Sequence, residues 1–138
     1  DVIVSVAPIL YVTGVKWLVE RPRPITSVGS GLLPGDPSFP SGHTAAAVIV
    51  SVMMILIVRN FARSRFPDGE DDERANRRRV FLRRAIIGAV ALVVAVACSR
   101  LLLGLHYPTD VIISATICPL ISYAVWCVWN ACESAEEW

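Results

Sequence analysis

Charged residues are scarce in this sequence, and their scarcity excludes an ordinary soluble domain. Only 18% of the 138 residues are Asp, Glu, Lys or Arg, whereas 54% are hydrophobic. The mean hydropathy of +0.56 is too high for a typical soluble composition. The length indicates a single domain over residues 1–138, and so small a domain cannot bury this much apolar sequence by itself.

The sequence also has few metal-ligating residues and no visible secretion signal. Its four cysteines lie in or beside apolar runs, and none forms a C-x-x-C pair near a histidine. We therefore expect them to be packing residues rather than disulfide partners or metal ligands. The apolar residues 2–12 lack the basic lead and cleavage site of a signal peptide. Because the chain begins with Asp1 rather than Met, we expect it to be a fragment that lacks N-terminal segments.

What the sequence does contain is four apolar segments, at residues 2–19, 42–58, 85–103 and 111–129. Each has about 17–20 residues, which is near the length that an α-helix needs to cross a bilayer. None shows the polar stripe of a helix on a soluble protein. We predict an all-α, integral-membrane bundle with four transmembrane helices. The alternative is a soluble bundle, but a domain this small cannot hide four helices that are apolar all round.

The net charge of +1 conceals an uneven distribution of basic residues. Nine of the 13 Lys and Arg residues fall within residues 59–84, which we predict to be a cytoplasmic loop by the positive-inside rule. A site for nucleic acid or acidic lipid is the alternative for this segment, and we favour the topology signal and expect no nucleic-acid partner. If residues 59–84 are cytoplasmic, the helices before and after them cross the membrane in alternating directions, and residues 16–43 and 99–110 meet at the outer face. Residues 25–40, rich in Gly, Pro and Ser, form an ordered loop there.

Two polar clusters flank this outer loop. KWLVERPRP (16–24) places Lys16 and Arg23 at the end of the first helix, although snorkelling cations at the membrane interface would look the same. In FPSGHT (39–44), Ser41 is a natural N-cap and Gly42 lets a ligand approach the backbone. Free N–H groups and the helix dipole favour an anion there. A plain helix cap is the alternative, but it does not explain His43.

A third cluster, SRLLLGLHYPTD (99–110), joins the last two apolar segments. Arg100 lies near the outer end of the third helix. The spacing of four brings His106 and Asp110 to one side of the first turn of the fourth helix. The carboxylate then holds one imidazole N–H, and the other ring nitrogen is left as a nucleophile or base. The alternative is that His106 and Asp110 only hydrogen-bond to each other at the junction of two helices and have no part in chemistry.

Taken together, the clusters predict a site for phosphate chemistry. Three cations (Lys16, Arg23 and Arg100) and backbone donors suit a phosphate group, which needs several charge-assisted hydrogen bonds. Two histidines suit phosphoryl transfer, because one can attack phosphorus while the other protonates the leaving oxygen. Few carboxylates other than Asp110, Glu20 and Asp36 accompany them, so we predict no metal and no cofactor. Arginine and lysine then provide the electrostatic clamp.

These residues resemble the type 2 phosphatidic acid phosphatase superfamily over essentially the whole chain. Its pattern is K-x6-R-P, then P-S-G-H, then S-R-x5-H-x3-D. The pattern is met in order by Lys16…Arg23-Pro24, by Pro40-Ser41-Gly42-His43 and by Ser99-Arg100…His106…Asp110. Membrane members of the family usually have six helices, so the resemblance implies that the first two are missing from this chain.

The resemblance implies a metal-independent phosphatase with a phosphohistidine intermediate. By motif position, His106 is the nucleophile, Asp110 orients it, and His43 is the general acid. The residues expected to hold the phosphate are Lys16, Arg23, Ser41, Gly42 and Arg100.

The expected substrate is a lipid phosphate or an isoprenyl diphosphate, and by analogy we favour one of the undecaprenyl type. The expected location is the plasma membrane, with the site on the extracytoplasmic side. A non-catalytic membrane protein that binds phospholipid headgroups is the alternative from another class. A vanadate-using haloperoxidase or a soluble acid phosphatase is the second enzyme alternative, which the transmembrane segments disfavour.

Overall fold

The computed structural model describes residues 2–24, 36–65 and 72–136. Its helices are α1 (Val2–Val19), α2 (Gly42–Arg65), α3 (Asp72–Leu102) and α4 (Pro108–Glu136). No strand occurs within these described ranges. The all-α prediction is confirmed. Most of the predicted outer loop, residues 25–35, lies outside the described residues.

Three of the helices are long and apolar enough to cross a membrane. These are α2, α3 and α4, the last over Pro108–Trp129, while α1 has a shorter apolar stretch over Val6–Val19. Large apolar side chains such as Trp17, Leu102 and Val128 are exposed on the outside of the bundle. Lipid tails can cover such surfaces, while the helices satisfy their own backbone hydrogen bonds. The prediction of a membrane helical bundle is confirmed.

The predicted loop over residues 59–84 is wrong for most of its length. Helix α2 continues to Arg65, and α3 already begins at Asp72. Residues 72–84 contain no Gly or Pro, and acidic residues in the first turn of α3 favour the positive end of the helix dipole. An i,i+4 ion pair between Arg77 and Glu73, at 2.6 Å, adds support. The Arg-rich segment is therefore mainly a polar extension of two helices.

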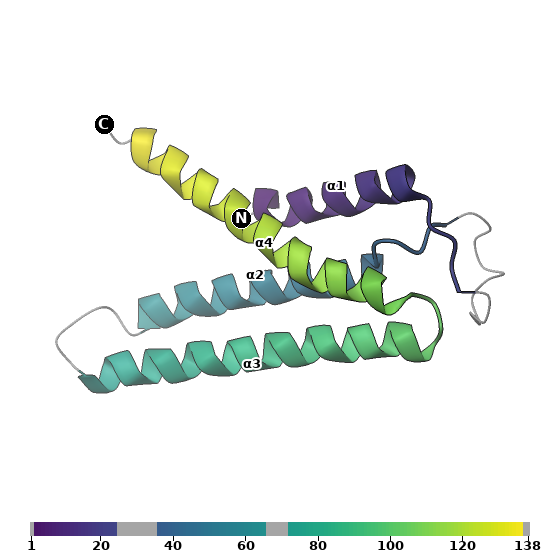
Figure 1. Cartoon of the computed structure of the whole chain (residues 1–138). Coiled ribbons are helices and arrows are strands. Elements are labelled where there is room, and N and C mark those ends of the chain that lie inside the picture. Colours follow the sequence, from purple (N-terminus) through teal and green to yellow (C-terminus); the bar gives the residue numbers. More distant parts are fainter. Residues whose placement is uncertain (1, 25–35, 66–71, 137–138) are drawn as a thin grey trace.

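Helices α2 and α3 form an antiparallel pair, and α4 crosses the bundle obliquely and contacts both α1 and α2 (Figure 1). The small core contains Val12, Ala45, Val48 and Cys118. Fully buried Cys118 is a packing residue as predicted, whereas Cys98 and Cys132 are exposed.

Segments that are distant in sequence meet at one end of the bundle. The end of α1, the start of α2, the end of α3 and the start of α4 all lie there, opposite the end at which α2 leads toward α3 (Figure 1). A backbone hydrogen bond of 3.3 Å from Ser41 N to the Asp110 carbonyl ties two of these segments together. The prediction that residues 16–43 and 99–110 come together is confirmed for residues 16–24, 36–43 and 99–110, which the structure describes.

Candidate active site

The C-terminus of α3 turns the chain into the site through a glycine. Gly104 has a φ of 64°, a left-handed conformation that glycine adopts without steric cost. Its N–H donates to the Leu101 carbonyl at 3.0 Å, and Leu105 N–H donates to the Arg100 carbonyl at 3.1 Å. This pair of bonds is the Schellman ending of a helix. The reversal at Gly104 directs His106 back across the bundle end.

The N-terminus of α2 is capped as predicted. The Ser41 hydroxyl accepts hydrogen bonds from Thr44 N–H at 3.4 Å and from Thr44 Oγ1 at 3.0 Å. Because Ser41 Oγ accepts both, its own O–H remains available as a donor. The Ser41 side chain is fully buried. At Gly42, an added Cβ would meet no atom within 4 Å, so a ligand has room to approach the first N–H groups of the helix.

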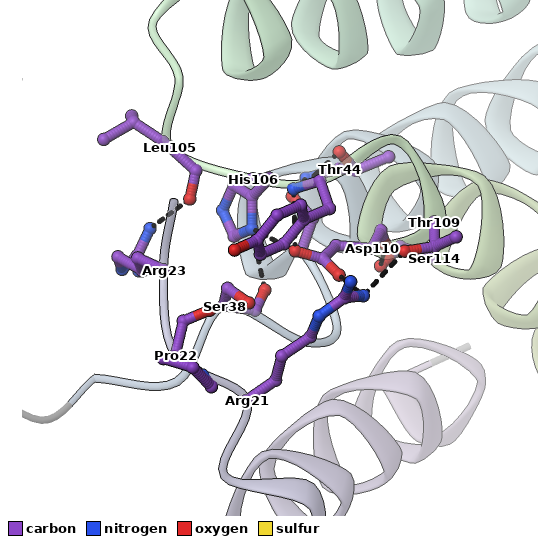
Figure 2. Close-up of polar contacts among 12 residues, drawn as sticks. Arg21, Pro22, Arg23, Ser38, Thr44, Leu105, His106, Thr109, Asp110 and Ser114 are labelled. Atoms are coloured by element: carbon purple, nitrogen blue, oxygen red, sulfur yellow. Dashed lines mark hydrogen bonds and ion pairs between the residues drawn. The ribbon is translucent and has the colours of Figure 1, made fainter. Parts of the chain in front are cut away.

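His106 is a buried side chain held by a backbone carbonyl. Its Nδ1 lies 2.7 Å from the Ser38 carbonyl oxygen (Figure 2), and a carbonyl oxygen can only accept. Nδ1 therefore carries the proton, and Nε2 keeps a free lone pair. The Asp110 carboxylate is farther away, at 3.5 Å from Nδ1. The sequence-based expectation that this carboxylate holds the imidazole N–H thus missed Ser38 as the nearer acceptor.

The environment of His106 favours its neutral form. Burial is the largest influence and lowers its pKa below the ordinary value of 6.5. The hydrogen bond to Ser38 opposes this effect, the charge of Arg23 adds to it, and Asp110 opposes it. The net direction is downward, so the imidazole is mostly neutral at neutral pH and its Nε2 lone pair is available.

Asp110 is fully buried at the start of α4, and its two oxygens have different partners. Oδ2 accepts the Tyr107 N–H at 3.0 Å. Oδ1 lies 2.9 Å from Arg21 Nη1, so the buried negative charge is paired with a cation from the segment after α1. Figure 2 shows the Arg21 side chain reaching toward Asp110 and Thr109.

Lys16 and Arg23 share a single carboxylate. Lys16 Nζ lies 2.7 Å from Asp36 Oδ1, and Arg23 Nη2 pairs with the other oxygen, Asp36 Oδ2. Arg23 also donates to the carbonyls of Asp36 and Leu105, at 3.2 and 3.1 Å. Burial of Asp36 acts to raise its pKa, but the hydrogen bonds and charges of Lys16 and Arg23 outweigh burial, so the pKa lies below its usual value.

Arg100 and His43 complete the cluster. Arg100 is half-buried, and its Nε donates to the Ser99 hydroxyl at 3.2 Å. His43 is exposed at the start of α2. Arg100, Arg23, Lys16 and Asp36 all lie near enough to act electrostatically on His43. Every residue that the sequence predicts for the site therefore belongs to the same end of the bundle.

Three residues with clear roles in this geometry carry no predicted function in the sequence. Ser38 acts through its backbone carbonyl, which leaves no side-chain signal. Arg21 lies between the motif positions Lys16 and Arg23, and the only signal is that it is one of four basic residues outside residues 59–84. Asp36 was visible as a nearby carboxylate, but its pairing with two cations depends on the fold.

The described residues contain no group of three or more His, Cys, Asp and Glu side chains that could hold a metal ion. What they gather is a helix N-terminus, several cations and a histidine with a free ring nitrogen. Such an arrangement can bind a tetrahedral anion and present a nucleophile to it.

Apolar helices with this cluster of cations, histidines and a helix N-terminus at one end define the class of the protein as a membrane helical bundle. The family model described as PAP2 superfamily matches residues 1–133. The chain belongs to this superfamily, which confirms the resemblance in its motifs and suggests phosphatase activity. No curated protein and no solved structure matches the chain significantly.

Proposed function

We propose that this chain is a metal-independent membrane phosphatase that acts on a lipid phosphate or an isoprenyl diphosphate at the outer membrane face. In this proposal the reaction passes through a phosphohistidine. The observation that carries it is the 2.7 Å contact between His106 Nδ1 and the Ser38 carbonyl, because it leaves Nε2 as a nucleophile, and Arg23 is near enough to act electrostatically on the imidazole. Family membership supports the phosphatase class.

In the first step, the Nε2 lone pair of His106 attacks phosphorus. The bond between phosphorus and the leaving oxygen breaks, and His43 donates a proton to that oxygen. Lys16, Arg23 and Arg100 balance the negative charge that develops on the other phosphate oxygens. Backbone N–H groups from Gly42 onward, with Ser41 as the cap that orders them, add donors from the helix N-terminus.

In the second step, water attacks the phosphohistidine. His43, now neutral, takes a proton from the water molecule, and the P–N bond breaks. Inorganic phosphate leaves and His106 regains its lone pair. Asp110 orients the imidazole together with Ser38 and offsets part of the positive charge that forms on it during the reaction.

A groove next to the site supports an amphiphilic substrate. It lies between α1 and α2, has a volume of about 370 Å³, and begins at Gly42. Its lining is almost entirely apolar and includes Ile9, Val12 and Val50. A phosphate group at the N-terminus of α2 would place an attached hydrocarbon chain at the mouth of this groove. An undecaprenyl-type diphosphate and phosphatidic acid both have such a chain.

The test is phosphate release by the detergent-solubilised chain in the presence of EDTA, with phosphatidic acid and an isoprenyl diphosphate as substrates. We expect release to persist in EDTA and to be inhibited by vanadate, a mimic of the pentacoordinate transition state. We expect His106→Ala to lose about 10³-fold or more in kcat. His43→Ala is the matched control, because it keeps the His106 nucleophile: from a labelled substrate whose leaving group needs no proton it should still accept radiolabelled phosphate covalently, whereas His106→Ala should not.

The pH profile gives a further readout of the same proposal. Attack requires neutral His106, and the pKa of His106 lies below 6.5. The acid limb of kcat/KM should therefore fall below pH 6.5. Release that depends on a divalent metal, or a labelled phosphoenzyme in His106→Ala, would contradict the mechanism. Binding of phosphatidic acid without any release would favour a headgroup-binding protein instead.

A further inference from the structure

Arg21 is outside the family motif, yet its side chain contacts three residues of the turn that follows His106. Nη1 donates to Thr109 Oγ1 at 2.7 Å and to Asp110 Oδ1 at 2.9 Å. The guanidinium group also lies over the Tyr107 ring, 4.1 Å from its centroid. One side chain from the segment after α1 thus fixes the whole turn between His106 and Asp110 (Figure 2).

The same residue reaches His106 through its backbone. The Arg21 carbonyl accepts the Ser38 N–H at 2.7 Å, and the Ser38 carbonyl accepts Nδ1–H of His106 at 2.7 Å. Arg21 therefore supports both groups that face Nδ1: Ser38 through the backbone, and Asp110 through the side chain.

The ion pair also determines how Asp110 acts on the imidazole. With Arg21 on Oδ1, much of the buried negative charge of Asp110 is compensated. Without Arg21, the carboxylate would lose its cation in a fully buried position. It would keep the neutral Tyr107 N–H as a donor, and its uncompensated charge would act more strongly on the Nδ1–H of His106, 3.5 Å away. The imidazolium form would then be favoured. As the pH falls, His106 would become protonated, and lose its nucleophilic lone pair, at a higher pH than in the unchanged chain.

We propose that Arg21 is a positioning residue for His106, which holds the imidazole in its Nδ1-protonated form and keeps it neutral by pairing with Asp110. The proposal rests on the proposed role of His106 as nucleophile. The charged groups that act directly on His106 among the described residues are Arg23, from the same segment as Arg21, and Asp110, from α4; Arg21 acts on the imidazole through its ion pair with Asp110.

A lysine would not replace Arg21 fully. The planar guanidinium donates to Thr109 and Asp110 from one nitrogen while its face stacks on Tyr107. An ammonium group is a compact charge that cannot combine these contacts in the same way. Arg21→Lys should therefore preserve the charge effect on His106 but only part of the positioning, which separates the two functions experimentally.

The first experiment is an NMR titration of the full chain in detergent micelles with ¹⁵N-labelled histidine. The chain has two histidines, so His43→Asn assigns the ring signals. In Arg21→Gln we expect the titration midpoint of His106 to rise by about half a pH unit or more, because Asp110 has lost the cation that compensates its charge. Arg21→Lys should stay close to the unchanged chain. The matched control is Arg59→Gln, since Arg59 also lies over an aromatic ring, that of Trp126.

An unchanged His106 midpoint in Arg21→Gln, or the same rise in Arg59→Gln, would overturn the proposal. If Arg21→Gln does not fold, Thr109→Val and Tyr107→Leu remove single contacts of Arg21 and keep its charge. Each should weaken the Nδ1–H signal that marks the bound tautomer without moving the midpoint as far. Unaltered tautomer signals in both would also overturn the proposal.

The second experiment measures phosphate release from an aryl phosphate monoester. Per folded molecule, Arg21→Gln should lose about 10- to 100-fold in kcat with little change in KM. A loss of folded protein at constant kcat would show a merely structural role and reject positioning. If the unchanged chain releases no phosphate, the proposed function fails, yet the NMR titration still decides the effect of Arg21 on His106.

Discussion

Asp36 gives the unliganded site its own anion. Its two carboxylate oxygens are divided between Lys16 and Arg23, which are the cations proposed to hold the substrate phosphate. The pKa of Asp36 lies below its usual value because hydrogen bonds and charges from these two residues outweigh burial, so Asp36 stays ionised at neutral pH. An incoming phosphate must therefore compete with this carboxylate or share the cations with it.

We predict that Asp36→Asn binds inorganic phosphate and vanadate more tightly, with inhibition constants lowered about three- to tenfold. In the unchanged chain, the Asp36 carboxylate repels the incoming anion and occupies the donors of Lys16 and Arg23. Solvent screening of these part-exposed ion pairs limits the size of the effect. Asp36→Glu keeps the charge and should change little. Asp72→Asn, at the opposite end of the bundle, is the control for a general loss of negative charge.

A rise in the two inhibition constants, instead of a fall, would assign Asp36 a different role. If Asp36→Asn weakens phosphate binding, then Asp36 serves mainly to align Lys16 and Arg23 for the ligand rather than to compete with it. The inhibition constants of the two anions, measured at constant ionic strength, decide between these roles.

For single residues, the sequence predicts which side chains form the site better than it predicts their hydrogen-bond and ion-pair partners. The predicted topology and the motif residues Lys16, Arg23, His106 and Asp110 indicated that these side chains lie at one end of the bundle. The acceptor for His106 could not be predicted, because Ser38 uses a backbone carbonyl that every residue has. Likewise, the ion pair of Asp110 joins residues 89 positions apart, a distance over which only the fold brings them together.

At the scale of elements, the ends of the helices determine where the reactive groups lie. The Schellman ending of α3 places Gly104 at a φ of 64°, and His106 follows two residues later. A side chain at this position has to adopt a left-handed conformation that glycine tolerates best. The direction of the chain into the site therefore depends on this residue.

We predict that Gly104→Ala destabilises the fold by about 1 kcal/mol and lowers kcat by more than the loss of folded protein explains. Gly88→Ala is the matched control, because Gly88 lies inside α3 and an added Cβ there meets no atom within 4 Å. That variant should be neutral or slightly more stable, since alanine is the better helix former. Unfolding in mixed micelles measures the first effect, and phosphate release measures the second. Equal behaviour of the two variants would contradict the role of Gly104.

Hydropathy located the helices, and both ends of α1, but not the polar ends of α2 and α3. The apolar runs identify the membrane-crossing parts of α2 and α3, yet both helices continue through polar sequence to Arg65 and from Asp72. Charge marks where a segment leaves an apolar environment, and helical propensity decides where the helix stops. Residues 72–84 contain no Gly or Pro to interrupt α3, so the helix begins well before the apolar run does.

At the scale of the whole molecule, charge separates the two ends of the bundle. One end carries the candidate site, and the other carries the nine arginines of residues 59–84. Lys and Arg near the ends of membrane-spanning helices stay on the cytoplasmic side. Because the helical extensions keep these arginines beside the apolar parts of α2 and α3, the rule applies to them although the segment is not a loop.

We predict from this distribution that the site faces away from the cytoplasm. Glu20→Cys lies at the site end and Asp72→Cys at the Arg-rich end, and both positions are exposed. In a background without Cys98, Cys127 and Cys132, a membrane-impermeant maleimide should label Glu20→Cys in intact cells and Asp72→Cys only after permeabilisation. Cys118 can be retained because it is fully buried, and denatured samples should label both introduced cysteines equally. The reverse labelling pattern would place the site in the cytoplasm, where the substrate would have to be a lipid of the inner leaflet.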